Sequence, residues 1–348
     1  MTEPTGMSIV GLGARTALGE GVAPSLAAVR AGIAGFEAHP FMIDKAGERM
    51  IVARASYLAD DAVGARRFVD LAVPAVVEAL QVLKEARLPE IPVLLGIPAP
   101  RPGRPATLAR DLAAALKGIA PLGEAAVFPL GHAAWFWTLS KAAELFQGRR
   151  SEFCLVGGVE SYLDPETLEW VDANNQLHSD SNSWGFVPGE AAGFCLLATP
   201  AAVKRHKLAS LAHVQSWGTG REPNLIKTET VCLGKGLTEA FRTALAGLPS
   251  GQRVNHMVCD MNGEPYRADE LGFTVSRTGG RFDDAADYSA PADCWGDVGA
   301  ASAPLFAASV ATAAAKGLAA GPRTLIWASS EGGERGAALL EAEVKPCP

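Results

Sequence analysis

The stretch AAWFWTLSKAAELFQGRRSEFCLVGG, residues 133–158, contains the unit from which the fold of this chain can be read. Residues 133–146 are rich in Ala, Leu and aromatic residues and contain neither Gly nor Pro, which predicts a helix that ends at Gly148. The apolar run 152–156 predicts a strand, and Gly157-Gly158 predicts a turn after it. Residues 193–198, GFCLLA, predict the next strand. The unit is therefore helix, strand, turn and strand.

The last third of the chain repeats this order. An Ala-rich helix is expected over 300–318, closed by Gly321-Pro322, and is followed by a strand over 324–328. Gly332-Gly333 and a closing strand over 337–344 complete the unit, and the strand 254–259 corresponds to an earlier strand at 91–97. The chain thus predicts an α/β fold of two duplicated halves, residues 1–200 and 201–348, with a seam near 201–208. The two unit helices would be buried where the halves meet, although packing alone would also explain their apolar stripes.

Composition and charge exclude several classes of protein. Hydrophobic residues make up 48% of the 348 residues and charged residues 20%, as in a globular chain with a large core. The net charge is −7, from 31 basic and 38 acidic residues, and the only dense basic run is 204–207, which argues against a nucleic-acid partner. Residues 1–7 lack a signal-peptide pattern and no apolar run reaches 18 residues, so a cytoplasmic protein without a membrane span is expected.

The cysteines are scattered and show no metal-binding or disulfide spacing. Cys154, Cys195 and Cys259 lie in apolar runs and are predicted to be buried thiols. The other three are at positions 232, 294 and 347. Neither a metal nor another cofactor is expected from these patterns.

Four strings resemble landmarks of one enzyme family. They are SIVGLGARTALG at 8–19, AAVRAG at 27–32, GGVE at 157–160 and, most specifically, GFVPGEAAG at 185–193. Together they are similar to the β-ketoacyl-acyl-carrier-protein synthases of the thiolase superfamily. The resemblance implies the thiolase fold, in which duplicated α/β halves form a layered αβαβα arrangement. It also implies dimers and ligands that are acyl thioesters.

Synthases of this family use a cysteine thiolate at a helix N-terminus and two hydrogen-bond donors, His/His or His/Asn, that stabilise an enolate. Counting back from Gly148, the cysteine position falls on Gly131 or, with a slip of one residue, on His132. Asn262 stands at the first histidine of the family, and Glu264 stands at the threonine that follows. An amide donates a hydrogen bond but cannot shuttle a proton.

Three further family positions also differ. Asp297, within CWGDVGAASAPL at 294–305, replaces the second donor, and an ionised carboxylate only accepts hydrogen bonds. The family's lysine before this motif is missing, since residues 291–293 read PAD. The G-F-G-G turn reads SSEGG at 329–333, with Glu331 in place of the gating phenylalanine. The resemblance therefore implies a synthase fold without the Cys-His-His/Asn triad and without decarboxylative condensation.

The fold would bring His132, Asn262, Asp297 and Glu331 together. One interpretation makes His132 a general base oriented by Asp297 or Glu331, and the other makes the cluster a set of side chains that satisfy one another's hydrogen bonds in a closed pocket. Further candidate substrate-binding residues are Gly131, Phe186 and Cys294. Phe186 would line an acyl pocket or belong to the core. Cys294 is a candidate replacement nucleophile, although the neighbouring Asp293 would raise the pKa of its thiol. The remaining histidines, 39, 178, 206, 213 and 256, have no evident partner in sequence and are expected to be surface or structural residues.

Two functions follow from this pattern. The first is a degenerate, non-condensing synthase-like subunit of fatty-acid or polyketide-type metabolism, like the chain-length factors. It would bind acyl-CoA or an acyl carrier protein and form a homodimer or a heterodimer with an active synthase. The second is an acyltransferase or thioester hydrolase with a repurposed site that uses His132 as base.

Overall fold

One ten-stranded sheet organises the protein, which we describe from a computed structural model covering residues 6–83, 88, 90–225, 228 and 230–346. The strand order is β10-β9-β11-β12-β8-β1-β7-β6-β4-β5. Five strands come from the earlier part of the chain: β1 (Met7–Thr16), β4 (Ile91–Gly96), β5 (Leu122–Phe128), β6 (Phe153–Ser161) and β7 (Glu190–Ala198). Five come from the later part: β8 (Ala212–Arg221), β9 (His256–Cys259), β10 (Tyr288–Ser289), β11 (Arg323–Ser329) and β12 (Glu334–Glu341).

The strands of the two halves follow corresponding orders when each half-sheet is followed outward from the middle of the sheet. β1 and β8 meet there through three antiparallel residue pairs, of which Met7↔Val214 is one. Outward from β1 lie β7, β6, β4 and β5, and outward from β8 lie β12, β11, β9 and β10. The duplicated halves predicted from the sequence are thus present as two mirrored half-sheets. The division at residue 200 stays a prediction, and the helix α6 (Pro200–His206) lies at that point.

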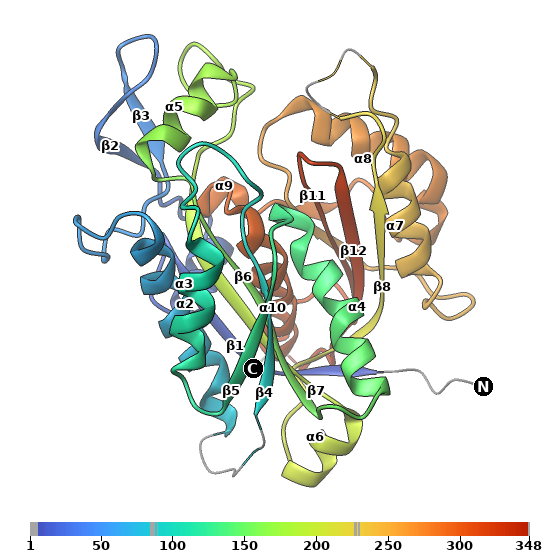
Figure 1. The fold of residues 1–348 in the computed structure, drawn as a ribbon. Helices are drawn as coiled ribbons and strands as arrows, with labels where there is room; N and C mark the ends of the chain where they lie inside the picture. The colour runs from blue at the N-terminus through green and yellow to red at the C-terminus, as the bar shows by residue number, and fades with distance from the viewer. Residues whose placement is uncertain (1–5, 84–87, 89, 226–227, 229, 347–348) are drawn as a thin grey trace.

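Helices form three layers around these half-sheets (Figure 1). α2 (Ala65–Ala79) and α3 (Leu108–Lys117) cover the outer face of the first half-sheet, and α7 (Lys235–Leu245) with α8 (Pro265–Thr278) forms the outer layer of the second. α4 (Ala134–Gln147) and α10 (Ser302–Ala315) lie between them and contact strands of both half-sheets. The αβαβα arrangement is therefore confirmed.

The remaining elements connect or cover these layers. A separate two-stranded sheet of β2 (Glu37–Ile43) and β3 (Arg49–Val52) lies beside α5 at one end of the molecule (Figure 1). The short helices are α1 (Val22–Arg30), α5 (Pro165–Ala173) and α9 (Ala292–Trp295), with 3₁₀ turns η1 (Leu80–Leu83), η2 (Gly131–Ala133), η3 (Gly279–Arg281) and η4 (Gly299–Ala301). In the described part of the chain, no helix is both long and apolar enough to cross a bilayer. Residues 1–5 and Cys347, which the sequence analysis considered, lie outside the described residues.

The predicted helix–strand unit corresponds to α4 and β6, but its glycine pair is not a turn. β6 continues through Gly157 and Gly158 to Ser161. A Cβ on Gly158 would lie 2.0 Å from the carbonyl oxygen of Ala300, at the start of η4. A Cβ on Gly157 would lie 2.2 Å from the ring of Phe194 on β7. The glycines are needed because backbone and side chains approach the strand closely, not because the chain turns there.

The core around α4 and α10 is nearly dry and closely packed. Trp135 and Phe136 of α4 and Phe306 of α10 are each at most 1% exposed. Gly336 on β12 is in contact with Phe136, since a Cβ there would lie 2.2 Å from the phenyl ring. As predicted, Cys154, Cys195 and Cys259 are buried thiols. In a core packed this densely, the addition or removal of one methyl group affects the packing of the surrounding side chains.

We expect Gly158→Ala to lower the free energy of unfolding by about 1–3 kcal/mol, because the added methyl group overpacks the contact with Ala300. Gly272→Ala is the matched control, since Gly272 is exposed within α8 and a Cβ there has no neighbour within 4 Å. That substitution should raise the free energy of unfolding by about 0.5–1 kcal/mol. Urea unfolding of the three proteins measures both changes, and a Gly158→Ala protein as stable as wild type would contradict the close approach.

Candidate functional site

His132 lies at the start of α4, in the turn η2, and is 5% exposed. The turn begins with Gly131, whose φ of 62° lies in the left-handed region that favours glycine. The backbone N–H of Ala133 donates to Ser330 Oγ at 2.9 Å, so the loop after β11 holds the turn in place. These contacts fix the direction of the imidazole.

Asp297 is the direct partner of His132. The ring Nε2 lies 2.7 Å from Asp297 Oδ1 and 3.0 Å from Oδ2. Asn262, in the loop after β9, donates from Nδ2 to Asp297 Oδ2 at 2.7 Å, and the backbone N–H of Gly299 donates to Oδ1 at 2.9 Å. The structure thus brings together His132, Asn262 and Asp297, the three residues predicted from the sequence resemblance, from three separate segments around one carboxylate that is 4% exposed.

A buried arginine that the sequence analysis missed completes the cluster. Arg267 on α8 is 1% exposed and places Nη2 3.4 Å from His132 Nε2 and 3.8 Å from Asp297 Oδ2. Its Nη1 donates to Asp260 Oδ2 at 2.5 Å and to the carbonyl oxygen of Ser329 at 3.0 Å. The signal in the sequence was an arginine that follows two acids, Asp260 and Glu264, at a helix start.

Glu331 belongs to the same network through two intermediate residues. Gln176 donates from Nε2 to Glu264 Oε1 at 2.9 Å and also to Glu331. Glu264 in turn accepts from Asn262 Nδ2 at 3.1 Å, and burial raises its pKa. The four polar residues expected to converge therefore do so, with Glu331 linked through Gln176 and Glu264 and with Asp297 as the carboxylate that contacts His132.

The electrostatics of the pair favour its charged form. Burial lowers the pKa of His132, but the charge and hydrogen bond of Asp297, together with the charge of Asp260, leave that pKa above its usual 6.5. Burial would raise the pKa of Asp297, yet His132, Arg267 and the Gly299 N–H together hold it well below its usual range. Both shifts favour the imidazolium–carboxylate form of the pair. In that form Nε2 carries the proton that faces Asp297, and Nδ1 is the ring nitrogen left for another partner.

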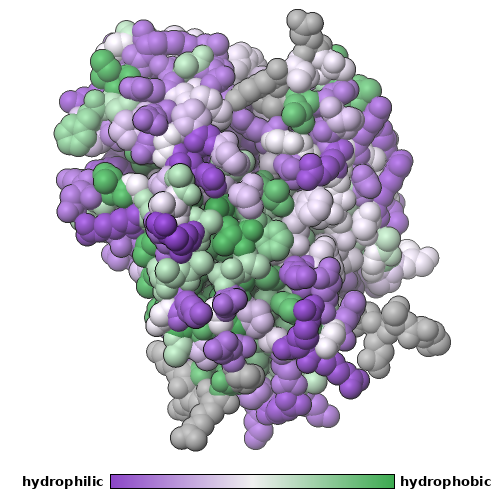
Figure 2. All heavy atoms as spheres, viewed as in Figure 1, coloured by the Kyte–Doolittle hydropathy of each residue, from purple (hydrophilic) through white to green (hydrophobic). Residues whose placement is uncertain are grey.

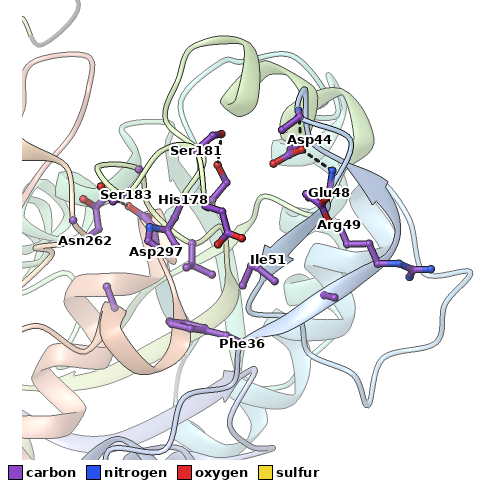
Figure 3. A pocket seen from close by; sticks show the side chains of 18 of the residues that line it. Phe36, Asp44, Glu48, Arg49, Ile51, His178, Ser181, Ser183, Asn262 and Asp297 are labelled. Carbon is purple, nitrogen blue, oxygen red and sulfur yellow. Dashed lines mark hydrogen bonds between the residues drawn. The ribbon is translucent and has the colours of Figure 1, made fainter.

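Two cavities approach this cluster. A cavity of about 270 Å³ is lined by His132, Gly131 and Glu331, together with Arg101 and Tyr162. A cavity of about 870 Å³ lies between the β2–β3 hairpin and the segment 178–187. Figure 3 shows Asn262 and Asp297 at one end of the larger cavity and Asp44, Glu48 and Arg49 at the other. The polar cluster borders both cavities.

Phe186 and Cys294 lie outside this arrangement. Phe186 is 3% exposed and packs edge-on against Tyr162, with ring centroids 5.3 Å apart, in a core cluster with Met50 and Leu168. Cys294, on α9, has its Sγ 3.9 Å from the carbonyl oxygen of Val29, and burial raises the pKa of its thiol. Neither residue lines the two cavities at the cluster. The structure therefore supports the core interpretation for Phe186 and places Cys294 away from His132.

Within the described residues, one group of side chains is close enough to share a metal ion. It consists of Glu222, Cys232 and Glu270 and does not include His132. Glu270 already forms a 2.5 Å ion pair with Arg335, and burial raises the pKa of the Cys232 thiol. This pairing opposes metal binding, because a cation there would have to displace the guanidinium from its buried partner.

The whole chain matches known ketosynthase structures. "The ishigamide ketosynthase/chain length factor" aligns with a TM-score of 0.81 at 15% identity, covering 98% of this chain and 100% of that one. A type II polyketide synthase acyl-carrier protein in complex with its hexaketide-bound ketosynthase gives 0.79 at 14% identity, with 98% and 100% coverage. The ketosynthase from module 6 of the bacillaene synthase of Bacillus subtilis 168 gives 0.77 at 15%, with 97% and 72% coverage. This chain has the thiolase fold of the ketosynthases. No protein-family model and no curated protein sequence matches it.

We expect His132→Gln to destabilise the protein by about 3 kcal/mol near pH 6, because it removes one partner of a buried ion pair. The stability that His132 contributes through its raised pKa is fully present below pH 6.5 and is lost as the pH rises through the higher folded value. The difference between wild type and variant should therefore shrink as the pH rises above 6.5. Urea unfolding at several pH values measures it, with Asp297→Asn as the background in which the pH dependence should vanish. A difference that grows with pH would contradict the imidazolium assignment.

Proposed function

We propose that this chain is a non-condensing, ketosynthase-like subunit of fatty-acid or polyketide-type metabolism that binds an acyl thioester. The observation that carries the proposal is the buried cluster of His132, Asp297 and Arg267, of which the first two stand at positions that the sequence resemblance aligns with catalytic residues. The chain-length-factor neighbour in the structural comparison is consistent with it.

The thiols and the charges support the proposed absence of condensation. The described cysteines at 154, 195, 232, 259 and 294 have raised pKa values, with burial as the largest cause of each, and they do not line the cavities at His132. A condensing synthase needs a thiolate and donors that face a developing enolate. Here the ionised Asp297 takes the hydrogen bonds of Asn262 and His132, so these donors are not free to stabilise an enolate.

The cavity beside His132 suits a thioester carbonyl. The imidazolium presents Nδ1–H as a donor while Nε2 stays on Asp297. Arg101 lines the same cavity with a side chain that is 8% exposed, and its Nε has no hydrogen-bond partner within the described residues. Two charged donors beside about 270 Å³ of space support binding of a polarised acyl oxygen without a covalent bond.

The edge strand β5 supports pairing with a second chain. Within the described sheet its neighbour is β4, and its other edge is unpaired. Figure 2 shows an apolar region over this part of the molecule, between α3 and α4 in the view of Figure 1. An unpaired edge beside apolar surface favours addition of another strand. The second chain would be another copy or an active synthase.

A second function has one observation in its favour. Asp297 orients His132 as a carboxylate orients the base of a hydrolase, and His132 borders a cavity. An acyltransferase or thioester hydrolase with His132 as base would need the neutral imidazole, and the raised pKa of His132 opposes this at neutral pH. Such an activity would increase as the pH rises through that value.

Intact-mass spectrometry with a panel of acyl- and malonyl-thioesters tests the ligand. We expect a non-covalent complex under native conditions, no mass increase under denaturing conditions and no product. His132→Gln should reduce occupancy about tenfold, through loss of one charge-assisted hydrogen bond, whereas His206→Gln on α6 should not. A covalent adduct would contradict the proposal. If product forms with wild type but not with His132→Ala, the second function is supported. If the protein gives no adduct, no complex and no product, it is a purely structural subunit.

Native mass spectrometry also tests the pairing. We expect a dimer that Ala126→Glu converts to monomer, because Ala126 is exposed on β5 and a carboxylate there would be buried on strand addition. Ala268→Glu, the same substitution at an exposed position on the outer helix α8, is the matched control and should leave the dimer intact. A wild-type monomer would contradict self-pairing, and co-expression with an active ketosynthase would then test the heterodimer.

A further inference from the structure

The side chains of His256, Asp287 and Ser289 meet on one face of the sheet, far along the chain from His132. β9 and β10 pair in parallel with Ser289 opposite Val258, and β11 places Thr324 opposite His256. Because side chains alternate along a strand, His256, Val258, Ser289 and Thr324 share one face. Asp287, two residues before Ser289, lies on that face as well.

The contacts among these residues follow the order hydroxyl, imidazole, carboxylate. Ser289 Oγ lies 2.8 Å from His256 Nε2, and His256 Nδ1 lies 3.4 Å from Asp287 Oδ2. The two ring nitrogens thus contact different partners, so Nδ1–H can donate to the carboxylate while Nε2 accepts the proton of the hydroxyl. The carboxylate distance is long, as is common at such sites without substrate.

This face forms the floor of a cavity of about 440 Å³. Its apolar walls come from Leu26 and Val29 of α1, from Val310 of α10, and from Leu318 beyond α10. Its lining includes His256, Asp287 and Ser289, and it shares no lining residue with the two cavities at His132. A nucleophile, a base and an orienting acid therefore border a space that would hold an apolar group.

The geometry points to a second, hydrolytic site in which Ser289 is the nucleophile, His256 the general base and Asp287 the residue that orients it, acting on esters of aliphatic acids. The apolar walls favour an aliphatic acyl chain. The side chains of Arg30 and Thr324 in the same lining are the donors available to a negatively charged oxygen. This inference does not depend on the proposed function.

The reaction balances with water as the co-substrate. Ser289 Oγ forms a bond to the ester carbonyl carbon while its proton passes to His256 Nε2. The alcohol leaves with that proton as the C–O bond of the ester breaks, which gives an acyl-Ser289 ester. Water, deprotonated by His256, then attacks the same carbon, and the carboxylic acid leaves as Ser289 recovers its proton.

His213 provides a matched comparison within the same protein. Its ring nitrogens lie 3.1 Å from Ser8 Oγ and 3.2 Å from Ser210 Oγ, so it contacts two hydroxyls and no carboxylate in the described part of the chain. It also lines none of the cavities described above. Ser210 therefore shares the serine–histidine contact of Ser289 but lacks the acid and the cavity.

The test combines a fluorophosphonate probe with hydrolysis of p-nitrophenyl butyrate by the full-length protein. The probe should form one adduct, on Ser289, located by peptide mapping after release of fluoride. Ser289→Ala should abolish both the adduct and hydrolysis above the spontaneous rate. His256→Gln should slow both by about 100-fold, the contribution of a general base, and Asp287→Asn should slow them by a smaller factor.

Ser210→Ala should leave both the adduct and hydrolysis unchanged, and the position of the adduct on Ser289 separates this site from the His132 cluster. The proposal is overturned if wild type carries no adduct on Ser289. It is equally overturned if Ser289→Ala hydrolyses the butyrate as wild type does, or if labelling of Ser289 is independent of His256.

Discussion

The buried charge of Asp297 is the constraint on which the candidate site depends. A carboxylate that is 4% exposed is stable only when donors replace its water, and here His132, Asn262 and the Gly299 N–H do so while Arg267 adds a second positive charge. These donors come from the start of α4, the loop after β9, the start of α10 and the helix α8. The interactions with this one carboxylate therefore hold segments of both half-sheets and the central helices in fixed positions relative to one another.

The duplicated architecture makes this convergence possible. α4 and α10 lie between the half-sheets, and both begin with a 3₁₀ turn at the same end of the sheet, so His132 and Asp297 meet although 165 residues separate them. The close contact of Gly158 with the Ala300 carbonyl sets how near η4 can come to β6. The packing of the central layer thus decides the distance between the imidazole and the carboxylate.

The sequence predicted the features that depend on local pattern. The α4 helix, the strands of the repeated unit and the positions of His132, Asn262 and Asp297 follow from periodicity, glycine spacing and family motifs. Arg267 was missed because arginine is rarely buried, and only the surrounding acids, distributed over the fold, explain its place. The contact of His256 with Ser289 depends on the parallel pairing of β9 and β10, a long-range register that a sequence pattern does not encode. Gly157-Gly158 was predicted as a turn because a glycine required by packing looks the same in sequence as one required by conformation.

A buried ion cluster is weak evidence for stability, since well-packed apolar residues would often serve as well. A cluster that serves packing alone would be expected to close the space around it. Here about 270 Å³ remains open beside His132, and Arg101 also lines that space. Groups with shifted pKa values beside a polar cavity are typical of sites that bind ligands. The open space therefore favours a ligand-binding role for the cluster over a role in packing alone.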